Sequence, residues 1–264
     1  MYSRGSHVHE TSSQYLLRKK DAKTLILIIN DQYDEPIQIG KKGEYAHQKA
    51  FIIFEGKQGI YCTHSVPYFP NPTRTPFKKS GNAQHFLGFN INVNGLKLLS
   101  EHLWRTHPGI RFINVPEEFK IIGKFGDICA GKFKDDDADD VIHKGVFKTR
   151  AGFKLTMISR THSDSKEREY SDSIWDCLPK NYGQQFTVQT WRNNAENCCE
   201  DEVKNIIKIQ IREKNKKTTW RTGKDHSKIG FGKKGHIICF GDLNHTRLKK
   251  TRGGSLFVFQ NIFL

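Results

Sequence analysis

Residues 225–244, DHSKIGFGKKGHIICFGDLN, place a His-x-Lys sequence before two short apolar runs joined by a glycine-rich turn. The same construction occurs at residues 47–65, HQKAFIIFEGKQGIYCTHS. Apolar runs of this length around glycines predict a β-hairpin in each place. Because alternate residues of a strand share a face, the histidine and the lysine of each His-x-Lys point in the same direction. The sequence therefore predicts one structural unit built twice.

The two units also carry polar residues at matching positions. His47 precedes His64 by 17 residues, and His226 precedes Asn244 by 18 residues. In each unit the His-x-Lys is expected to open one strand and the later polar residue to close its hairpin partner. A pseudo-twofold axis between the units would bring two histidines and two lysines to one cleft, a set of groups suited to phosphoryl transfer. The alternative is coincidence, since the chain contains 12 histidines and 43 lysines and arginines.

The rest of the chain is a mixed succession of strands and helices. Strands are expected at residues 23–29, 85–93, 153–160, 185–191 and 251–263, and helices at residues 94–107 and from residue 171. Asn94 is the expected cap of the first helix, whose leucines recur at helical spacing. Residues 203–211 fit a helix or a strand equally well. Residues 1–22 form a polar N-terminal segment, and residues 23–150 and 151–264 are the two expected halves.

Composition limits the classes of partner. The formal charge of +15 favours a polyanion, and the basic residues alternate with aromatic ones as in nucleic-acid-binding surfaces, best in residues 212–228. No apolar run approaches 18 residues, which argues against a membrane span. The N-terminal residues lack the apolar centre of a signal peptide, so none is expected in this chain.

The sequence does not predict a metal or a cofactor. None of the six cysteines forms a Cys-x-x-Cys pair, which argues against zinc. The acidic run KDDDADD at residues 134–140 lacks the spaced oxygens, central glycine and distal glutamate of a calcium loop, so a solvated loop is expected.

Several longer strings resemble the deoxyribonuclease II family, acid endonucleases of the phospholipase D superfamily. They are LIINDQYDEP, HQK followed by HSVPYFP, GQQFTVQTW, DHSK, and CFGDLN followed by TRGGSLF. The resemblance covers most of the chain. It implies an α/β, phospholipase D-like fold in which two pseudo-twofold-related halves of mixed β-sheet, flanked by helices, share one active site.

The resemblance also assigns residues. The family's paired motifs fall on His47 with Lys49 and on His226 with Lys228. A further functional histidine falls on His64, and Asn244 matches the asparagine that closes the second motif. Asp225 matches the family's acid and is expected to orient the His226 imidazole through a charge-assisted hydrogen bond.

The implied activity is metal-independent hydrolysis of DNA through a phosphohistidine on His47, with His226 as the general acid and the two lysines holding the phosphate. Lysosomal or secreted localisation follows from the resemblance alone. No metal, cofactor or membrane is implied, and a homodimer is left open. Asn244 begins the one Asn-x-Thr glycosylation sequence of the chain, and we expect it to be unmodified because a glycan would block the cleft.

Three departures favour the alternative, a weakly active or inactive nucleic-acid-binding protein. Ile229 stands where the family has tryptophan after the second His-x-Lys. Cys239 and one of Cys198 and Cys199 match disulfide cysteines of the family, but Phe257 occupies the position expected to pair with Cys239. The family's first strands and its final segment are also missing from the sequence.

Overall fold

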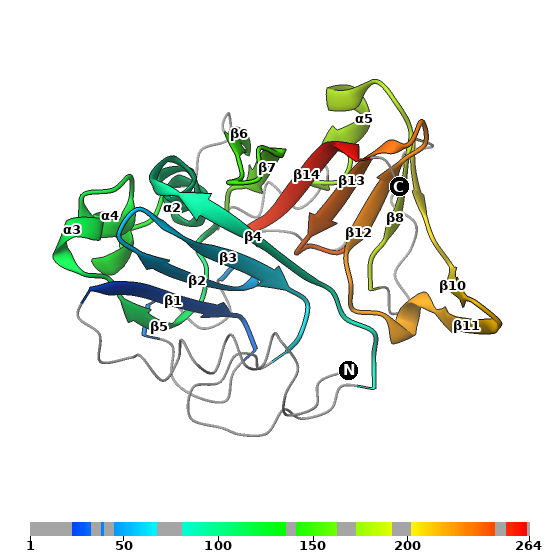
Figure 1. The fold of residues 1–264 in the computed structure, drawn as a ribbon, viewed down its shortest axis with the longest axis horizontal. Coiled ribbons are helices and arrows are strands. Elements are labelled where there is room, and N and C mark those ends of the chain that lie inside the picture. Colours follow the sequence, from blue (N-terminus) through cyan, green and yellow to red (C-terminus); the bar gives the residue numbers. More distant parts are fainter. Residues whose placement is uncertain are drawn as a thin grey trace.

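The structure is a computed structural model that describes residues 23–32, 38–39, 45–67, 81–135, 141–162, 173–191, 202–245 and 252–262 (Figure 1). The polar segment 1–22, most of the acidic run at 134–140, and Cys198 and Cys199 lie outside the described residues.

The first half forms a five-stranded antiparallel sheet in the order β4-β3-β2-β1-β5. Its strands are β1 (Thr24–Asn30), β2 (Lys49–Glu55), β3 (Gln58–His64), β4 (Phe86–Asn92) and β5 (Ile110–Asn114). Every residue of β1 is buried, as its uninterrupted apolar sequence predicts for a central strand. The predicted hairpin is confirmed as β2 and β3, whose turn places Gly56 at a φ of 57°.

Helix α2 (Val93–Thr106) crosses the sheet between β4 and β5, and the short helices α3 (Glu117–Lys120) and α4 (Phe125–Cys129) follow. The expected helix is confirmed, but its expected cap is wrong. The side chain of Asn92, not Asn94, accepts a hydrogen bond from the backbone N–H of Gly95 at 3.0 Å. Two asparagines of equal capping propensity stand two residues apart, and the last residue of β4 has the extended backbone that a cap needs.

The second sheet has seven strands in the order β6-β7-β14-β13-β12-β8-β9, antiparallel except for the β8–β9 pair. The strands are β6 (Ile142–Lys148), β7 (Lys154–Arg160), β8 (Phe186–Gln189), β9 (Val203–Asn205), β12 (Ile229–Gly232), β13 (His236–Gly241) and β14 (Gly254–Ile262). Helix α5 (Cys177–Tyr182) packs beside this sheet. The second predicted hairpin is confirmed as β12 and β13.

Strands β10 (Lys208–Glu213) and β11 (Lys216–Arg221) form a separate two-stranded ribbon that extends from the second sheet, followed by a single 3-10 turn (Thr222–Lys224) (Figure 1). Residues 203–211, which fitted either element type, are therefore two strands, β9 and β10.

A single apolar cluster joins the two sheets. Leu27 and Ile52 of the first sheet, Leu99 of α2, and Met157 and Phe257 of the second sheet belong to it and are almost completely buried. The α/β class is confirmed. The division at residue 150 stays a prediction, and β6, which precedes that boundary, pairs within the second sheet. In the part of the chain that is described, no helix is long and apolar enough to cross a membrane.

Residues 252–254 bring the second half into contact with the first. Gly253 follows Arg252 and leads into β14, and a Cβ atom on Gly253 would lie 2.2 Å from the carbonyl oxygen of Thr106, the last residue of α2. The Gly253 carbonyl accepts a hydrogen bond from the backbone N–H of His47 at 3.2 Å. Only glycine therefore fits where the second half meets the first His-x-Lys.

We expect Gly253→Ala to lower the free energy of unfolding by roughly 1–3 kcal/mol, because the added methyl group must displace backbone atoms rather than a flexible side chain. The measurement is equilibrium denaturation with urea. Gly81→Ala is the matched control, since a Cβ atom at position 81 meets nothing within 4 Å. Equal stability of the two variants would contradict a tight junction at Gly253.

Candidate active site

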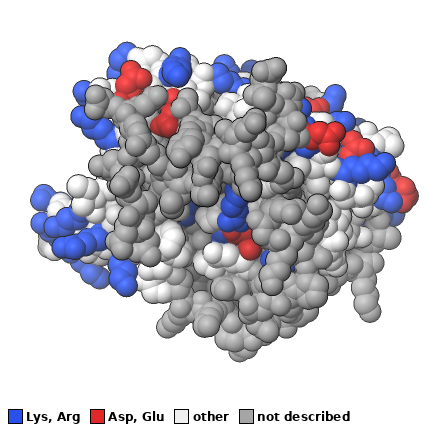
Figure 2. All heavy atoms as spheres, turned by 180° about the vertical axis from the view of Figure 1, so that it is seen from behind, with Lys and Arg blue, Asp and Glu red and all other residues white. Residues whose placement is uncertain are grey.

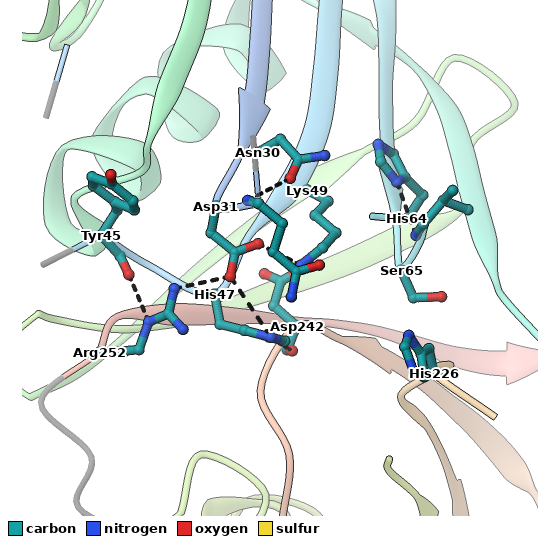
Figure 3. A network of polar contacts seen from close by, with 12 residues as sticks. Asn30, Asp31, Tyr45, His47, Lys49, His64, Ser65, His226, Asp242 and Arg252 are labelled. Carbon is teal, nitrogen blue, oxygen red and sulfur yellow. Dashed lines mark hydrogen bonds and ion pairs between the residues drawn. The ribbon is translucent and has the colours of Figure 1, made fainter. Parts of the chain in front are cut away.

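Asp31, directly after β1, is the centre of the site. Its side chain is 2% exposed and forms ion pairs with Lys49 and with Arg252, the latter at 2.9 Å, while the Nε2 atom of His47 lies 3.7 Å away (Figure 3). Burial alone would raise the pKa of this carboxyl, but Lys49, His47 and Arg252 together lower it well below its ordinary value. Asp31 is therefore a permanent anion that holds together cations from both halves.

The geometry fixes the tautomer of His47. The Nδ1 atom lies 2.7 Å from the backbone carbonyl oxygen of Asp242, in the second half. A carbonyl only accepts, so Nδ1 carries the proton and Nε2 keeps its lone pair. Burial, followed by the positive charge of Lys49, lowers the pKa of His47 to about 3. The His47 side chain is 22% exposed, and its neutral Nε2 atom keeps the lone pair that a nucleophile requires.

His64, the last residue of β3, has the opposite tautomer. The backbone N–H of Val66 donates to its Nδ1 atom at 3.2 Å, which leaves the proton on Nε2. Burial and the charge of Lys49 hold its pKa well below the ordinary value for histidine. Its ring stacks on Phe86 with centroids 5.2 Å apart. His64 is thus a neutral donor whose ring orientation is fixed.

The second His-x-Lys lies just before β12. The backbone N–H of His226 donates to the Ala83 carbonyl at 2.9 Å, so the first half positions it. Its Nε2 atom lies 2.9 Å from the amide nitrogen of Asn82, a donor, so Nε2 accepts in the neutral ring. Burial, then Lys228 and Lys49, lower the pKa of His226 to about 4.

Lys228 is buried, and its Nζ atom donates to the His226 carbonyl at 2.6 Å. Burial and the neighbouring Lys49 lower its pKa to about 7, against the opposing effect of Asp242 and two other carboxylates. Burial also raises the pKa of Asp242 to about 7, although hydrogen bonds with Ser255 and other neighbours oppose the shift. On acidification below pH 7 the site gains a proton on each of these two groups and becomes more positive.

The five predicted histidines and lysines lie within electrostatic reach of one another. Lys49 acts on the pKa of His64 and His226, and Lys228 acts on that of His47. Figure 3 shows His64 and His226 on the same side of the Asp31 cluster. The His-x-Lys segments of both hairpins therefore converge, as their repetition indicated.

The second hairpin differs from the first in length. Ala50 pairs with Thr63, which sets Lys49 opposite His64, whereas Ile229 pairs with Phe240 and the Lys228 carbonyl accepts from Gly241. Strand β13 accordingly ends at Gly241, three residues before Asn244. The expectation that Asn244 closes this strand as His64 closes β3 is wrong, because the second hairpin is two residues shorter.

The hydrogen bonds of Asn244 and Asp225 differ from those expected of the two residues. The Oδ1 atom of Asn244 is buried without a hydrogen-bond partner among the described residues. Asp225 accepts from the Trp220 indole at 2.8 Å and from the Ser227 backbone N–H at 2.9 Å, so its two oxygens hold the segment around His226 rather than the imidazole. Asp225 acts on His226 through its charge, which favours the protonated ring.

Sequence reasoning missed four residues of the site: Asp31, His85, Asp242 and Arg252. Asp31 and Arg252 lie within two of the quoted strings, but neither had a partner at a recognisable spacing. His85 is buried beside Lys228, whose backbone N–H donates to its Nδ1 atom at 3.2 Å. Burial and the charges of Lys228 and Lys49 lower the pKa of His85 to about 3, so it is a fourth neutral imidazole beside those of His47, His64 and His226.

Trp191 partly replaces the packing surface that is lost because Ile229 stands where the family has tryptophan. Ile229 begins β12 and pairs with Gln189, and the nearby Trp191 packs edge-on against the His226 ring with centroids 4.9 Å apart. Cys239 is buried and unbonded, which makes it a core residue on β13. No group of three His, Cys, Asp or Glu side chains suited to a metal ion occurs among the described residues.

Two His-x-Lys segments around a buried carboxylate define a cationic site with neutral imidazoles, as in proteins that handle phosphate esters. The family model for deoxyribonuclease II matches residues 1–264. The chain belongs to the deoxyribonuclease II family.

Individual relatives are distant but match along most of the chain. Deoxyribonuclease-2 of Caenorhabditis elegans is 26% identical over 231 residues, covering 83% of this chain and 58% of the relative. Plancitoxin-1 of Acanthaster planci is 24% identical over 253 residues, covering 89% and 66%. Deoxyribonuclease-2-alpha of Mus musculus is 24% identical over 259 residues, covering 92% and 70%. The chain thus spans between about three fifths and two thirds of the length of the first two relatives.

We expect Asp31→Asn to lower the free energy of unfolding at pH 7 by about 3–5 kcal/mol, because Lys49 would remain buried without its counter-charge. The effect should shrink progressively as the pH falls below about 4, because an aspartate of the unfolded chain takes up a proton there, whereas the folded carboxyl, with its depressed pKa, stays charged to much lower pH. Urea denaturation across this pH range measures it. Asp127→Asn, which breaks an exposed pair with Lys124, is the control and should cost less than about 1 kcal/mol.

Proposed function

We propose that this chain is an endonuclease that hydrolyses DNA phosphodiester bonds in acid without a metal ion, through a phosphohistidine intermediate on His47. The observation that carries the proposal is the fixed tautomer of His47, whose Nδ1 proton is held by the Asp242 carbonyl while Nε2 stays unprotonated. The family membership supports DNA as the substrate. A phospholipase D-like relation between the two halves is part of the same proposal.

In the first step the Nε2 atom of His47 attacks phosphorus, and the bond from phosphorus to the leaving oxygen breaks. A protonated His226 gives its proton to that oxygen. In the second step the neutral His226 takes a proton from water, whose oxygen attacks phosphorus and breaks the phosphorus–nitrogen bond. His226 then has its proton again and His47 is free, so both residues return to their starting states.

The remaining groups stabilise the charge on the nonbridging oxygens. Lys49 and Lys228 are cations at acid pH, and the Nε2–H of His64 is a fixed neutral donor. Burial and the two lysines lower the pKa of both His47 and His226, so the general acid takes up its proton only in acid solution.

An acid optimum follows from these pKa shifts. As the pH falls from 8 to about 5, Lys228 and Asp242 each gain a proton, and the fraction of protonated His226 rises. Plasmid nicking in EDTA should therefore increase over this range. Nicking that increases toward pH 8, or nicking that requires added Mg²⁺, would contradict the proposal. An acidic compartment, lysosomal or extracellular, is the localisation that we propose.

His226→Ala separates catalysis from binding. We expect it to abolish nicking, because proton transfer to the leaving oxygen is lost, and to leave DNA affinity within about twofold because one imidazole contributes little to a charge of +15. His236→Ala is the matched control, since His236 is exposed at the far end of β13. Tight binding by the unmodified chain with no nicking between pH 4 and 8 would identify a binding protein that has lost turnover.

A further inference from the structure

The β10–β11 ribbon has two chemically different faces. Its strands pair in register from Lys208 opposite Arg221 to Glu213 opposite Lys216. Because side chains alternate between the faces of a strand, the pairs Lys208–Arg221 and Arg212–Lys217 share one face, with a polar pair between them. The other face, called the apolar face below, carries Ile209, Ile211 and Trp220, together with Thr218 and, at the turn, the oppositely charged pair Glu213–Lys216.

The cationic face consists of two like-charged rungs. Lys208 and Arg221 lie directly opposite each other, as do Arg212 and Lys217, and all four are exposed. Like charges at opposed positions destabilise a strand pair. Within the described ranges none of the four forms an ion pair, and their face carries no acidic residue. The ribbon therefore keeps an uncompensated positive surface at a cost to its own stability.

The ribbon is attached to the segment that carries His226. Trp220, on the apolar face, donates to Asp225 at 2.8 Å, and the Trp191 indole donates to the Gly223 carbonyl at 3.2 Å. The Thr222 backbone N–H closes the base of the ribbon by donating to the Ile207 carbonyl at 3.2 Å. Since Trp220 is turned toward Asp225, the cationic face is directed away from it. Figure 2 shows basic side chains gathered over this projecting ribbon, at the left edge of the view.

We propose that the cationic face of the β10–β11 ribbon is a second DNA-binding surface, which holds the sugar–phosphate backbone of a duplex outside the cleavage site. The proposal rests on DNA being the ligand of the site. Four residues separate the two rungs along each strand, which corresponds to about 13 Å. The major groove of B-DNA is about 12 Å wide, so a ribbon whose strands run across the groove places one rung near each border. Each rung can therefore contact the phosphates on one border of the groove, without reading the bases.

The test is a variant in which Lys208, Arg212, Lys217 and Arg221 are all changed to Gln. These side chains are exposed, so the fold should be retained, which circular dichroism and urea denaturation verify. Binding to a 30-base-pair duplex is measured at several salt concentrations. Each lost phosphate contact reduces the slope of log affinity against log salt by about 0.9, so the slope should become shallower by about 3 to 4. At low salt the affinity should fall at least about tenfold.

The matched control changes Lys57, Lys97, Lys148 and Lys154 to Gln. It removes the same charge from exposed positions away from the ribbon and also contains a like-charged cross-strand pair, Lys148–Lys154. We expect its salt slope to stay within about one unit of the unmodified chain. Equal slopes and affinities for the two fourfold variants would overturn the proposal, because only total charge would then matter.

Measurements of cleavage test the ribbon proposal separately from the proposed endonuclease activity. Nicking at saturating DNA should be unchanged in the ribbon variant, while the DNA concentration for half-maximal rate should rise at least about tenfold. If the unmodified chain does not nick DNA, the binding comparison still decides the role of the ribbon. If nicking occurs and the ribbon variant binds as the control does, the ribbon proposal fails and the proposed endonuclease activity stands.

Discussion

The buried carboxylate of Asp31 is the interaction on which the site depends. It receives Lys49 from the first hairpin and Arg252 from the segment that leads into β14, and it lies beside His47. A carboxylate at this depth is costly unless cations surround it, and the cations are equally costly without it. Chain folding and site assembly are therefore linked, because the charges are compensated only when both halves are in place.

The local parts of this arrangement could be predicted from the sequence, whereas the long-range parts could not. Apolar runs joined by turns that contain Gly56 and Gly235 specify two hairpins, and His-x-Lys at a strand start places its two side chains on one face. The contact between His47 and the Asp242 carbonyl joins residues 195 positions apart, and no periodicity marks it. The same is true of His85 and Lys228.

The wrong predictions for the cap of α2 and for Asn244 also have physical causes. Asn92 and Asn94 have the same capping chemistry, and only the end of β4 selects between them. The expected equivalence of His64 and Asn244 assumed two hairpins of equal length. From the lysine to its cross-strand neighbour the two hairpins differ by two residues, so a similar spacing in the sequence does not correspond to the same position in the structure.

That difference in hairpin length has a stereochemical consequence. In a perfectly twofold site the two imidazoles would be interchangeable, and a bound phosphodiester could be attacked from either side. Here the cross-strand neighbour of Lys49 is His64, from the same hairpin, whereas that of Lys228 is Gly241, and the imidazole beside Lys228 is His85, from the first half. The broken symmetry gives the site a handedness: if His47 attacks as proposed, a bound DNA strand would have one productive polarity, with its leaving oxygen toward His226.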